Sequence, residues 1–485
     1  MGARAGRNAQ HPLDRKRFPS LTALSRPLIT NPYTDVMEKT LKTTRNRWLA
    51  RLAAVAVLAT AAAGMTACSS STPAVDPNAK STINWWSWNP DATTAQPWIA
   101  AFEKEHPNIT VNQRFIQIAD YPNAVRLAAT TDSGPDVFGL QVGAMAQQFA
   151  PLTTDLAPLA AQNIGSDWQT QLNATDQLNV KGKQVGLPWM ITGGGLVWYN
   201  KTILDKAGTK PPTTLAEWKD TCTKVEAIGV KCFVQGAKDS WVNLDVYQSI
   251  VNEIAPGEFY KAVNGQADFT EASFVQAFDA WKSLYTDGII DPGALGTTEY
   301  PDANDAFNKG EAAMIALGTW NDDHMTTATL ATAATTYGPQ ITSQVFAPIA
   351  FPDVVGGAKK TGRLFGGPDV GWAVSAKSKN QAAAFTFVQW LTSSQTAQTM
   401  MATSLQTPAL KSVPVPDTGL TDPAVQQPAL ADQATQISNL IGARQISNAD
   451  VATALGQALS AVASGQMSSS VAASSVETAI KAANQ

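Results

Sequence analysis

The alternation of strand and helix patterns is clearest in residues 82–115, which read TINWWSWNPDATTAQPWIAAFEKEHPNITVNQRF. It continues to residue 140, and we expect strands at 82–86, 109–115 and 136–140 and helices at 93–105 and 121–131. Such alternation favours an α/β fold with a largely parallel sheet. In that architecture, ligands bind beyond the carboxyl ends of the strands.

The middle of the chain repeats this pattern around a helix with a defined start. Thr214 and Glu217 have the spacing of a capping box, and Gly229 ends the helix before a short strand at 231–235. Further on, we expect strands at 312–317 and 371–375, loops at 293–304 and 413–423, one long helix from 381 to about 401, and Ala/Ser-rich helices in 432–483. We interpret the last region as packing and not as chemistry.

Positive charge is concentrated at the start of the chain. Residues 1–67 hold 11 of the 35 Lys and Arg and 3 of the 39 Asp and Glu, so 24 basic and 36 acidic residues follow, a formal charge of −12. A body this acidic disfavours binding to nucleic acid or anionic lipid. With 485 residues, 44% of them hydrophobic, the chain is long enough for at least two folding units.

An export signal explains the basic excess. Basic residues from Lys39 to Arg51 precede the apolar run 52–63, which at about 18 Å is too short for a bilayer core of about 30 Å. Met37 is suitably placed to be the translation start, with 1–36 either untranslated or an extended N-terminus. The residues leading into Cys68 resemble the lipobox of bacterial lipoproteins, although Met65 stands where Leu is usual. We therefore expect an export signal in 1–67 and a lipid-anchored tether in 68–81 at the outer face of the cytoplasmic membrane; ordinary secretion is the alternative.

Only two cysteines follow Cys68, namely Cys222 and Cys232. Because export places them where disulfides persist, and because the helix–turn–strand pattern can bring them together, we expect them to be bonded. Two buried free thiols are the alternative.

Five segments in order carry a family resemblance, and they lie at 83–88, 134–137, 187–218, 310–320 and 366–380. Together they resemble the extracellular solute-binding protein family 1, the carbohydrate receptors of ABC importers. The resemblance covers about residues 80–410 and implies a two-lobed, periplasmic-binding-protein-like (type II) α/β fold with a ligand cleft between the lobes. Lobe 1 is expected in 82–193 and 350–412, and lobe 2 in 194–349 and 413–485, with crossings near 192–196 and 346–353.

The function that the resemblance implies is binding without chemistry. We expect a monomeric receptor, without a cofactor, that binds a mono- or oligosaccharide by lobe closure and delivers it to the membrane subunits of an importer.

A sugar site needs flat apolar walls and a few fixed polar groups. Residues near the ends of expected strands supply candidates of both kinds, and Gly367 permits close approach of the backbone. For each, core packing, a solvated loop or a turn is the alternative. The candidate ligand-binding residues are Trp88, Asn89, Gln141, Trp189, Asp239, Trp241, Trp320, Asn321, Gly367 and Asp369.

Other chemistries have weaker signals. His106 and His324 are far apart in the sequence, which disfavours a histidine-based metal site. The acidic run at Asp287, Asp291, Glu299, Asp302 and Asp305 lacks the ligand spacing of an EF-hand, although calcium binding stays open. Two rival functions also stay open: a secreted glycoside hydrolase, which needs only two carboxylates, and a receptor for a polyamine, peptide or compatible solute.

Overall fold

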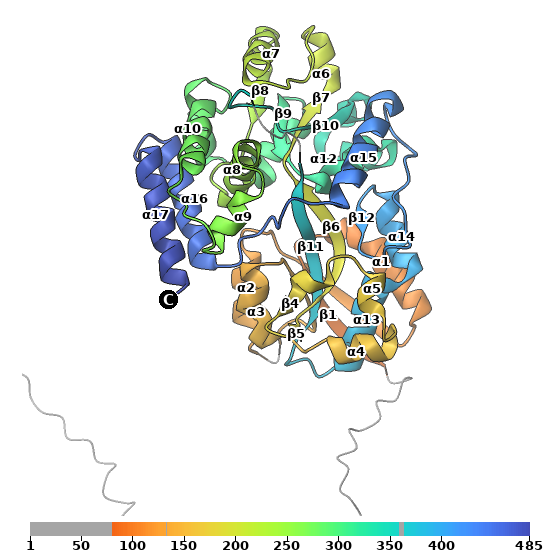
Figure 1. Ribbon diagram of the computed structural model, residues 1–485. Coiled ribbons are helices and arrows are strands. Elements are labelled where there is room, and N and C mark those ends of the chain that lie inside the picture. Colours follow the sequence, from red (N-terminus) through yellow and green to blue (C-terminus); the bar gives the residue numbers. More distant parts are fainter. Residues whose placement is uncertain (1–79, 132, 358–362) are drawn as a thin grey trace, which may run out of the picture. The chain divides into compact units, whose positions relative to one another are not determined.

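The computed structural model describes residues 80–131, 133–357 and 363–485 (Figure 1). The predicted export signal, Cys68 and most of the predicted tether lie outside the described residues. Among the described residues, no helix is both long enough and apolar enough to cross a membrane.

The first lobe is built on a six-stranded sheet with the strand order β12-β6-β11-β3-β1-β2. Its strands are β1 (Ser81–Ser87), β2 (Ile109–Phe115), β3 (Val137–Leu140), β6 (Leu187–Gly194), β11 (Phe365–Val374) and β12 (Thr407–Pro408). Strands β2 and β3 run parallel to β1, whereas β11 is antiparallel to β3 and β6, and β12 to β6. The sheet is therefore mixed and not largely parallel, because its other three strands return from distant parts of the chain.

Helices cover both faces of this sheet, and two adjacent tryptophans of β1 show it. Trp85 packs against Phe387 with ring centroids 5.1 Å apart, while Trp86 lies on the opposite face, where Tyr121 Oη donates to its carbonyl at 3.0 Å. Both tryptophans are buried. The helices of this lobe are α1 (Ala92–Glu105), α2 (Tyr121–Ala128), α3 (Ala144–Phe149), α4 (Ala157–Asn163), α5 (Trp168–Gln171), α13 (Gln381–Ser393) and α14 (Gln395–Thr403), beside a small hairpin of β4 (Asn179–Val180) and β5 (Lys183–Gln184).

The second lobe contains a four-stranded sheet with the order β10-β7-β9-β8. Its strands are β7 (Leu196–Asn200), β8 (Lys231–Val234), β9 (Ala312–Leu317) and β10 (Phe346–Ala350). Only Gly195, with φ +100°, separates β6 of the first sheet from β7 of the second, and the chain returns between β10 and β11. The strands of the six-stranded sheet lie within residues 81–194 and 365–408, and those of the four-stranded sheet lie within residues 196–350.

Ten α-helices among the described residues belong to the second lobe, and several of them pack against its sheet. They are α6 (Lys201–Lys206), α7 (Leu215–Ala227), α8 (Ser240–Ile254), α9 (Glu258–Val263), α10 (Ala272–Thr286), α11 (Asn304–Asn308), α12 (Thr327–Tyr337), α15 (Pro423–Ile437), α16 (Ala449–Ala463) and α17 (Ser469–Ala483). Helices α8, α10, α16 and α17 pack together at one side, and α15 packs against β10 (Figure 1).

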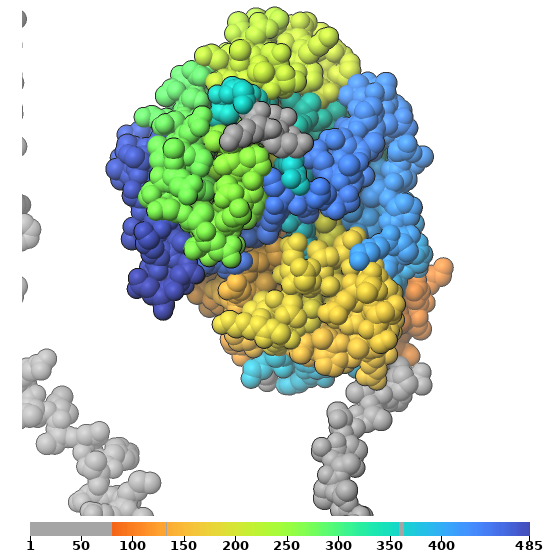
Figure 2. Space-filling model, in the orientation of Figure 1, coloured from red at the N-terminus to blue at the C-terminus, as the bar shows by residue number. Residues whose placement is uncertain are grey.

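Residues 438–448, here called the crossing segment, connect α15 to α16 along the first lobe. Gly366 N of β11 donates to Gly442 O at 2.8 Å, and Ala144 N donates to Ile446 O at 3.2 Å. In Figure 2, blue atoms from this end of the chain lie between the green helices of the second lobe and the yellow and orange first lobe. The segment therefore contacts the first lobe between two helices of the second.

The long helix expected from residue 381 to about 401 is two helices. Ser394 has an extended backbone, with φ −81° and ψ 141°, and its side chain accepts from Ala397 N at 3.0 Å. A serine in this position caps the second helix, so α13 ends and α14 begins anew.

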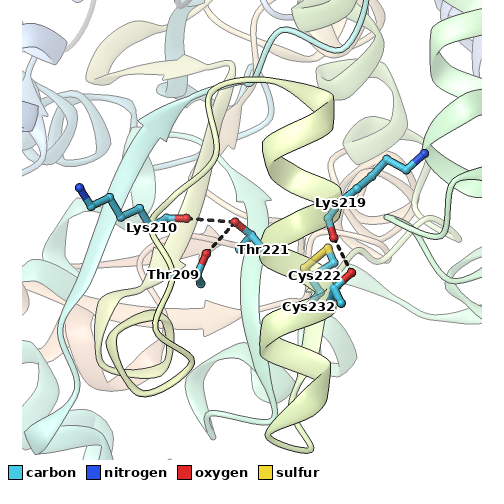
Figure 3. The surroundings of a disulfide bond; sticks show 7 residues. Thr209, Lys210, Lys219, Thr221, Cys222 and Cys232 are labelled. Carbon is cyan, nitrogen blue, oxygen red and sulfur yellow. Dashed lines mark hydrogen bonds between the residues drawn. A yellow bond between two sulfur atoms is a disulfide. The ribbon is translucent and has the colours of Figure 1, made fainter.

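Helix α7 begins with a capping box and carries one of the two cysteines. The Thr214 side chain accepts from Glu217 N at 3.3 Å, and the Glu217 carboxylate accepts from Thr213 N at 2.8 Å. One helical turn later, Cys222 forms a disulfide with Cys232 of β8, as expected from the sequence (Figure 3). The bond ties α7 to the edge strand of the second sheet.

Replacing both cysteines should destabilise this lobe. In the chain-entropy account, closing a loop with a sequence separation of 10 contributes about 2–3 kcal/mol. We expect Cys222→Ser/Cys232→Ser to unfold at lower denaturant concentration than the oxidised protein and at about the same concentration as the reduced wild type. Equal midpoints for the oxidised protein and the variant would contradict this expectation.

Candidate functional site

A cavity of about 460 Å³ is lined by residues of both lobes. The first lobe supplies residues at or just beyond the ends of its strands, together with Asp369 of β11: Trp88, Asn89, Asp91, Phe115, Gln117, Ile118 and Gln141. The second lobe supplies Trp241, Tyr300, Pro301, Asn304, Asp305, Trp320, Asn321, Asp323, His324 and Tyr337, and the crossing segment adds Arg444 and Gln445. The cavity therefore depends on both lobes.

Seven of the ten candidate residues come together in this lining. They are Trp88, Asn89, Gln141, Trp241, Trp320, Asn321 and Asp369. Most follow a strand or begin the next helix, as the rule for the carboxyl ends of strands predicts.

The other three candidates are placed elsewhere. Trp189 is buried in the core of the first lobe, with its ring 4.9 Å from that of Trp98. Asp239 turns toward the neighbouring loop, where its carboxylate accepts from Glu299 N at 2.7 Å. Gly367, with φ +144°, lies against the Gln177 side chain, which a Cβ would approach to 2.2 Å. Each has a structural role here, and none lines the cavity.

Two residues that the sequence reasoning missed are central to the site. Tyr300 lies in the loop expected at 293–304, and Arg444 lies in the Ala/Ser-rich region 432–483, which the sequence pattern assigned to packing. A signal for Arg444 was present, since it is the only basic residue between Lys411 and Lys481. An isolated base in so long a stretch indicates a specific partner.

Three aromatic rings form one wall of the cavity, here called the aromatic wall: Trp241, Tyr300 and Trp320. The Trp241 and Tyr300 rings are stacked, with centroids 6.1 Å apart and planes 14° apart, and Trp241 meets Trp320 edge-on at 6.0 Å. Trp320 Nε1 donates to Tyr300 Oη at 3.1 Å. Because each ring contacts another, their orientations are fixed before a ligand binds.

Arg444 joins this wall to two carboxylates. Its Nε lies 3.0 and 2.9 Å from the two carboxylate oxygens of Asp245 on α8, and its Nη1 donates to Asp369 Oδ1 at 3.0 Å. Gln141 Nε2 donates to the same Asp369 oxygen at 3.1 Å. Burial raises the pKa of Asp245 to about 6, although the Arg444 charge opposes the shift.

Asn321, which lines the cavity, has a buried side-chain donor that the described part of the protein does not use. Its side chain is buried, and its Nδ2 has no hydrogen-bond partner among the described residues. A buried amide without a partner costs free energy, which a ligand hydroxyl would recover.

The loop that carries Tyr300 is held by two acids behind the wall. The Glu299 carboxylate accepts from Gly236 N at 2.7 Å, and Asp239 holds Glu299 N. Burial raises the pKa of Glu299 to about 8; the Gly236 hydrogen bond opposes this shift, and the charges of Asp239 and Asp245 add to it. Burial therefore favours the protonated form of Glu299.

This carboxyl group should make folding stability depend on pH. Its folded pKa of about 8 lies above the ordinary value of 4.5, so the folded state binds the extra proton between these values. The contribution to stability is full below about pH 4.5 and is lost as the pH rises through 8. We expect Glu299→Gln to show a smaller fall in unfolding free energy than the wild type between pH 5 and 8, measured with denaturant. Glu103→Gln is the control, since the partly exposed Glu103 also accepts a backbone hydrogen bond, from Val111 N at 2.9 Å. Equal slopes for wild type and Glu299→Gln would contradict the assignment.

The described residues contain no group of three or more His, Cys, Asp or Glu side chains arranged to hold a metal ion. His324 lines the cavity and pairs with Asp323, Nδ1 to Oδ1, at 2.9 Å. The chemistry of the lining is therefore that of aromatic faces, amides and paired carboxylates.

Comparison with known proteins identifies the family. The model for bacterial extracellular solute-binding proteins matches residues 85–398. A galactooligosaccharide-binding protein of Bacillus subtilis is 25% identical over 353 residues, 70% of this chain and 74% of that protein. An uncharacterized ABC transporter extracellular-binding protein of Pyrococcus horikoshii is 25% identical over 234 residues, 46% of this chain and 52% of that protein. The match thus spans about half the length of the Pyrococcus protein.

Solved structures agree on the fold. A chitin oligosaccharide binding protein has a TM-score of 0.67 at 20% identity, covering 84% of this chain and 99% of that one. A maltose-bound protein of T. maritima has a TM-score of 0.64 at 20% identity, covering 83% and 100%. These neighbours are two-lobed, as this chain is. With a family match over more than half of its length, the chain belongs to the bacterial extracellular solute-binding protein family.

Proposed function

We propose that this protein is the carbohydrate receptor of an ABC-type importer, which binds a mono- or oligosaccharide in the cavity and delivers it unchanged. The observation that carries the proposal is that one cavity combines the aromatic wall with polar residues, one of which, Asn321, has an amide donor without a partner among the described residues. Aromatic faces suit the C–H faces of sugar rings, and the Asn321 amide suits a hydroxyl. Two similar proteins are named for binding galactooligosaccharides and chitin oligosaccharides, and these names favour a carbohydrate ligand.

Asp369 supplies a second hydroxyl-binding group. Its Oδ1 accepts from Gln141 and Arg444, whereas its Oδ2 accepts no hydrogen bond from the described residues. A carboxylate oxygen accepts a hydroxyl proton in a charge-assisted bond, which is stronger than a neutral one. We therefore infer that Asp369 and Asn321 fix the sugar against the aromatic wall.

A cationic ligand fits the cavity less well. The guanidinium of Arg444 already lies over the rings of Trp320 and Trp241, at 4.3 and 5.2 Å from their centroids. The protein thus fills the cation–π position that a polyamine would use. This observation disfavours a cation on the ring faces that Arg444 covers.

Hydrolysis is also disfavoured, because the carboxylates that line the cavity already have partners within the protein. Four carboxylates line the cavity, and each is engaged by the protein: Asp91 caps α1, and Asp305, Asp323 and Asp369 pair with Lys309, His324 and Arg444. A glycosidase requires one carboxyl group to donate a proton and a second to act as base or nucleophile, so it needs carboxyl groups that are free of such partners.

The two-lobed cavity supports the proposed delivery to an importer. Because both lobes contribute to the lining, a saccharide that contacts both stabilises the closed arrangement, which the membrane subunits would recognise. Membership of an extracellular family indicates an exported protein. We further propose that acylated Cys68 anchors a monomeric receptor to the membrane.

A thermal-shift screen of residues 69–485 tests the function. The panel contains mono- and oligosaccharides, polyamines and peptides. A saccharide at 100 times its dissociation constant should add about 2.7 kcal/mol and raise the melting temperature by a few degrees. A shift with polyamines or peptides alone would contradict the proposed ligand class.

A further inference from the structure

Arg444 is held by carboxylates from both lobes. Asp245 lies on α8 of the second lobe, and Asp369 lies on β11 of the first. The Arg444 side chain is 8% exposed, and those of Asp245 and Asp369 are 14% and 10% exposed. These ion pairs are therefore shielded from water, and they connect the two lobes at the edge of the cavity.

The same guanidinium packs against the aromatic wall. It lies 4.3 Å from the ring centroid of Trp320 and 5.2 Å from that of Trp241. A planar guanidinium can stack on indoles while its Nε donates to Asp245 and its Nη1 donates to Asp369, whereas a lysine ammonium has no planar face to stack. The position requires arginine and not merely positive charge.

Asp245 offers a way to separate positioning from direct contact. It is absent from the cavity lining, and Arg444 is its charged hydrogen-bond partner among the described residues. An effect of Asp245 on ligand binding is therefore indirect, and the ion pair with Arg444 is its direct hydrogen-bonded link to the lining. The remaining carboxylate, Asp369, lines the cavity.

We propose that Arg444, anchored by Asp245, is a positioning residue of the cavity. It orients the Trp241 and Trp320 indoles of the second lobe and the Asp369 carboxylate of the first. The aromatic wall and this hydrogen-bond acceptor are thereby held in a fixed arrangement. The effect on ligand affinity rests on the proposed function. The effect on the indoles does not.

The test compares Arg444→Lys, Asp245→Asn and the double variant. Near-UV circular dichroism and acrylamide quenching report the tryptophan environment without a ligand. Calorimetry reports affinity for raffinose, maltotriose or chitotriose, whichever binds the wild type. We expect a changed near-UV spectrum and an affinity loss of at least about 10-fold for each single variant. The double variant should bind no more weakly than Arg444→Lys, because the two residues act as one unit.

Arg114→Ala is the matched control. Arg114 also lies over a tryptophan, 4.5 Å from the Trp86 ring, but it is outside the cavity lining. Its affinity should stay within about twofold of the wild type. Variants of Arg444 and Asp245 that lose stability while keeping wild-type affinity and near-UV spectra would overturn the proposal.

Two other results are also decisive. If none of the three saccharides binds the wild type, the proposed function is contradicted for these probes, and the near-UV spectra alone judge the role of Arg444. If Arg444→Lys does not fold, the isosteric variant Asp245→Asn tests the role of Arg444. An unchanged near-UV spectrum of Asp245→Asn would then overturn the proposal.

Discussion

Trp320→Ala should weaken saccharide binding by about 70-fold or more. A sugar ring stacked on an indole removes about 100 Å² of apolar surface from water, which contributes about 2.5 kcal/mol. Trp320 also donates to Tyr300 and supports Arg444, so its removal loosens the rest of the wall. Titration calorimetry with the saccharide that gives the largest thermal shift measures the loss.

Trp320→Phe is the matched variant for this prediction. It keeps an aromatic face but loses the Nε1 hydrogen bond to Tyr300, so we expect it to bind more tightly than Trp320→Ala and less tightly than the wild type. An affinity for Trp320→Ala within about threefold of the wild type would show that Trp320 is not a ligand contact.

Gly236→Ala should lower both stability and affinity. A Cβ at this position would lie 2.0 Å from Glu299 N, 2.2 Å from Glu299 Cα and 2.3 Å from Thr298 C, all backbone atoms. The loop that carries Tyr300 must therefore move, and the hydrogen bond from Gly236 N to Glu299 is strained with it. We expect a loss of about 3 kcal/mol or more in unfolding free energy, at the upper end of overpacking effects.

Gly296→Ala controls for the general effect of removing a glycine. It lies close in sequence to the Tyr300 loop, and a Cβ there would meet no atom within 4 Å. Its unfolding free energy and affinity should stay near those of the wild type. If Gly236→Ala behaved like Gly296→Ala, the close packing behind the aromatic wall would not govern the site.

The sequence predicted the parts of the site that local rules govern. Trp88 and Gln141 follow strands β1 and β3, and Trp320 follows β9. Side chains beyond the ends of neighbouring strands gather at one edge of a sheet. Short-range patterns were therefore sufficient to predict that these residues lie together. The capping box at Thr214 and the disulfide depended on equally local spacing.

The misses have a different physical origin. Trp189 lies on a strand that is buried along its whole length, so the side chain packs in the core and the position near a crossing was not informative. Asp239 precedes Trp241 but turns toward Glu299, a partner that lies 60 residues away. Arg444 reaches the cavity only because the crossing segment returns to the first lobe. Such contacts depend on long-range packing, which single-residue patterns do not encode.

Recovery of the bound ligand tests the account most directly. The protein is incubated with the saccharide that stabilises it, separated from free ligand and denatured, and the released compound is quantified by mass spectrometry. The account predicts about one intact saccharide per chain and no shorter product. Cleaved saccharide would contradict it in favour of a hydrolase, and failure of every saccharide to be retained, with retention of a cation instead, would contradict the proposed ligand class.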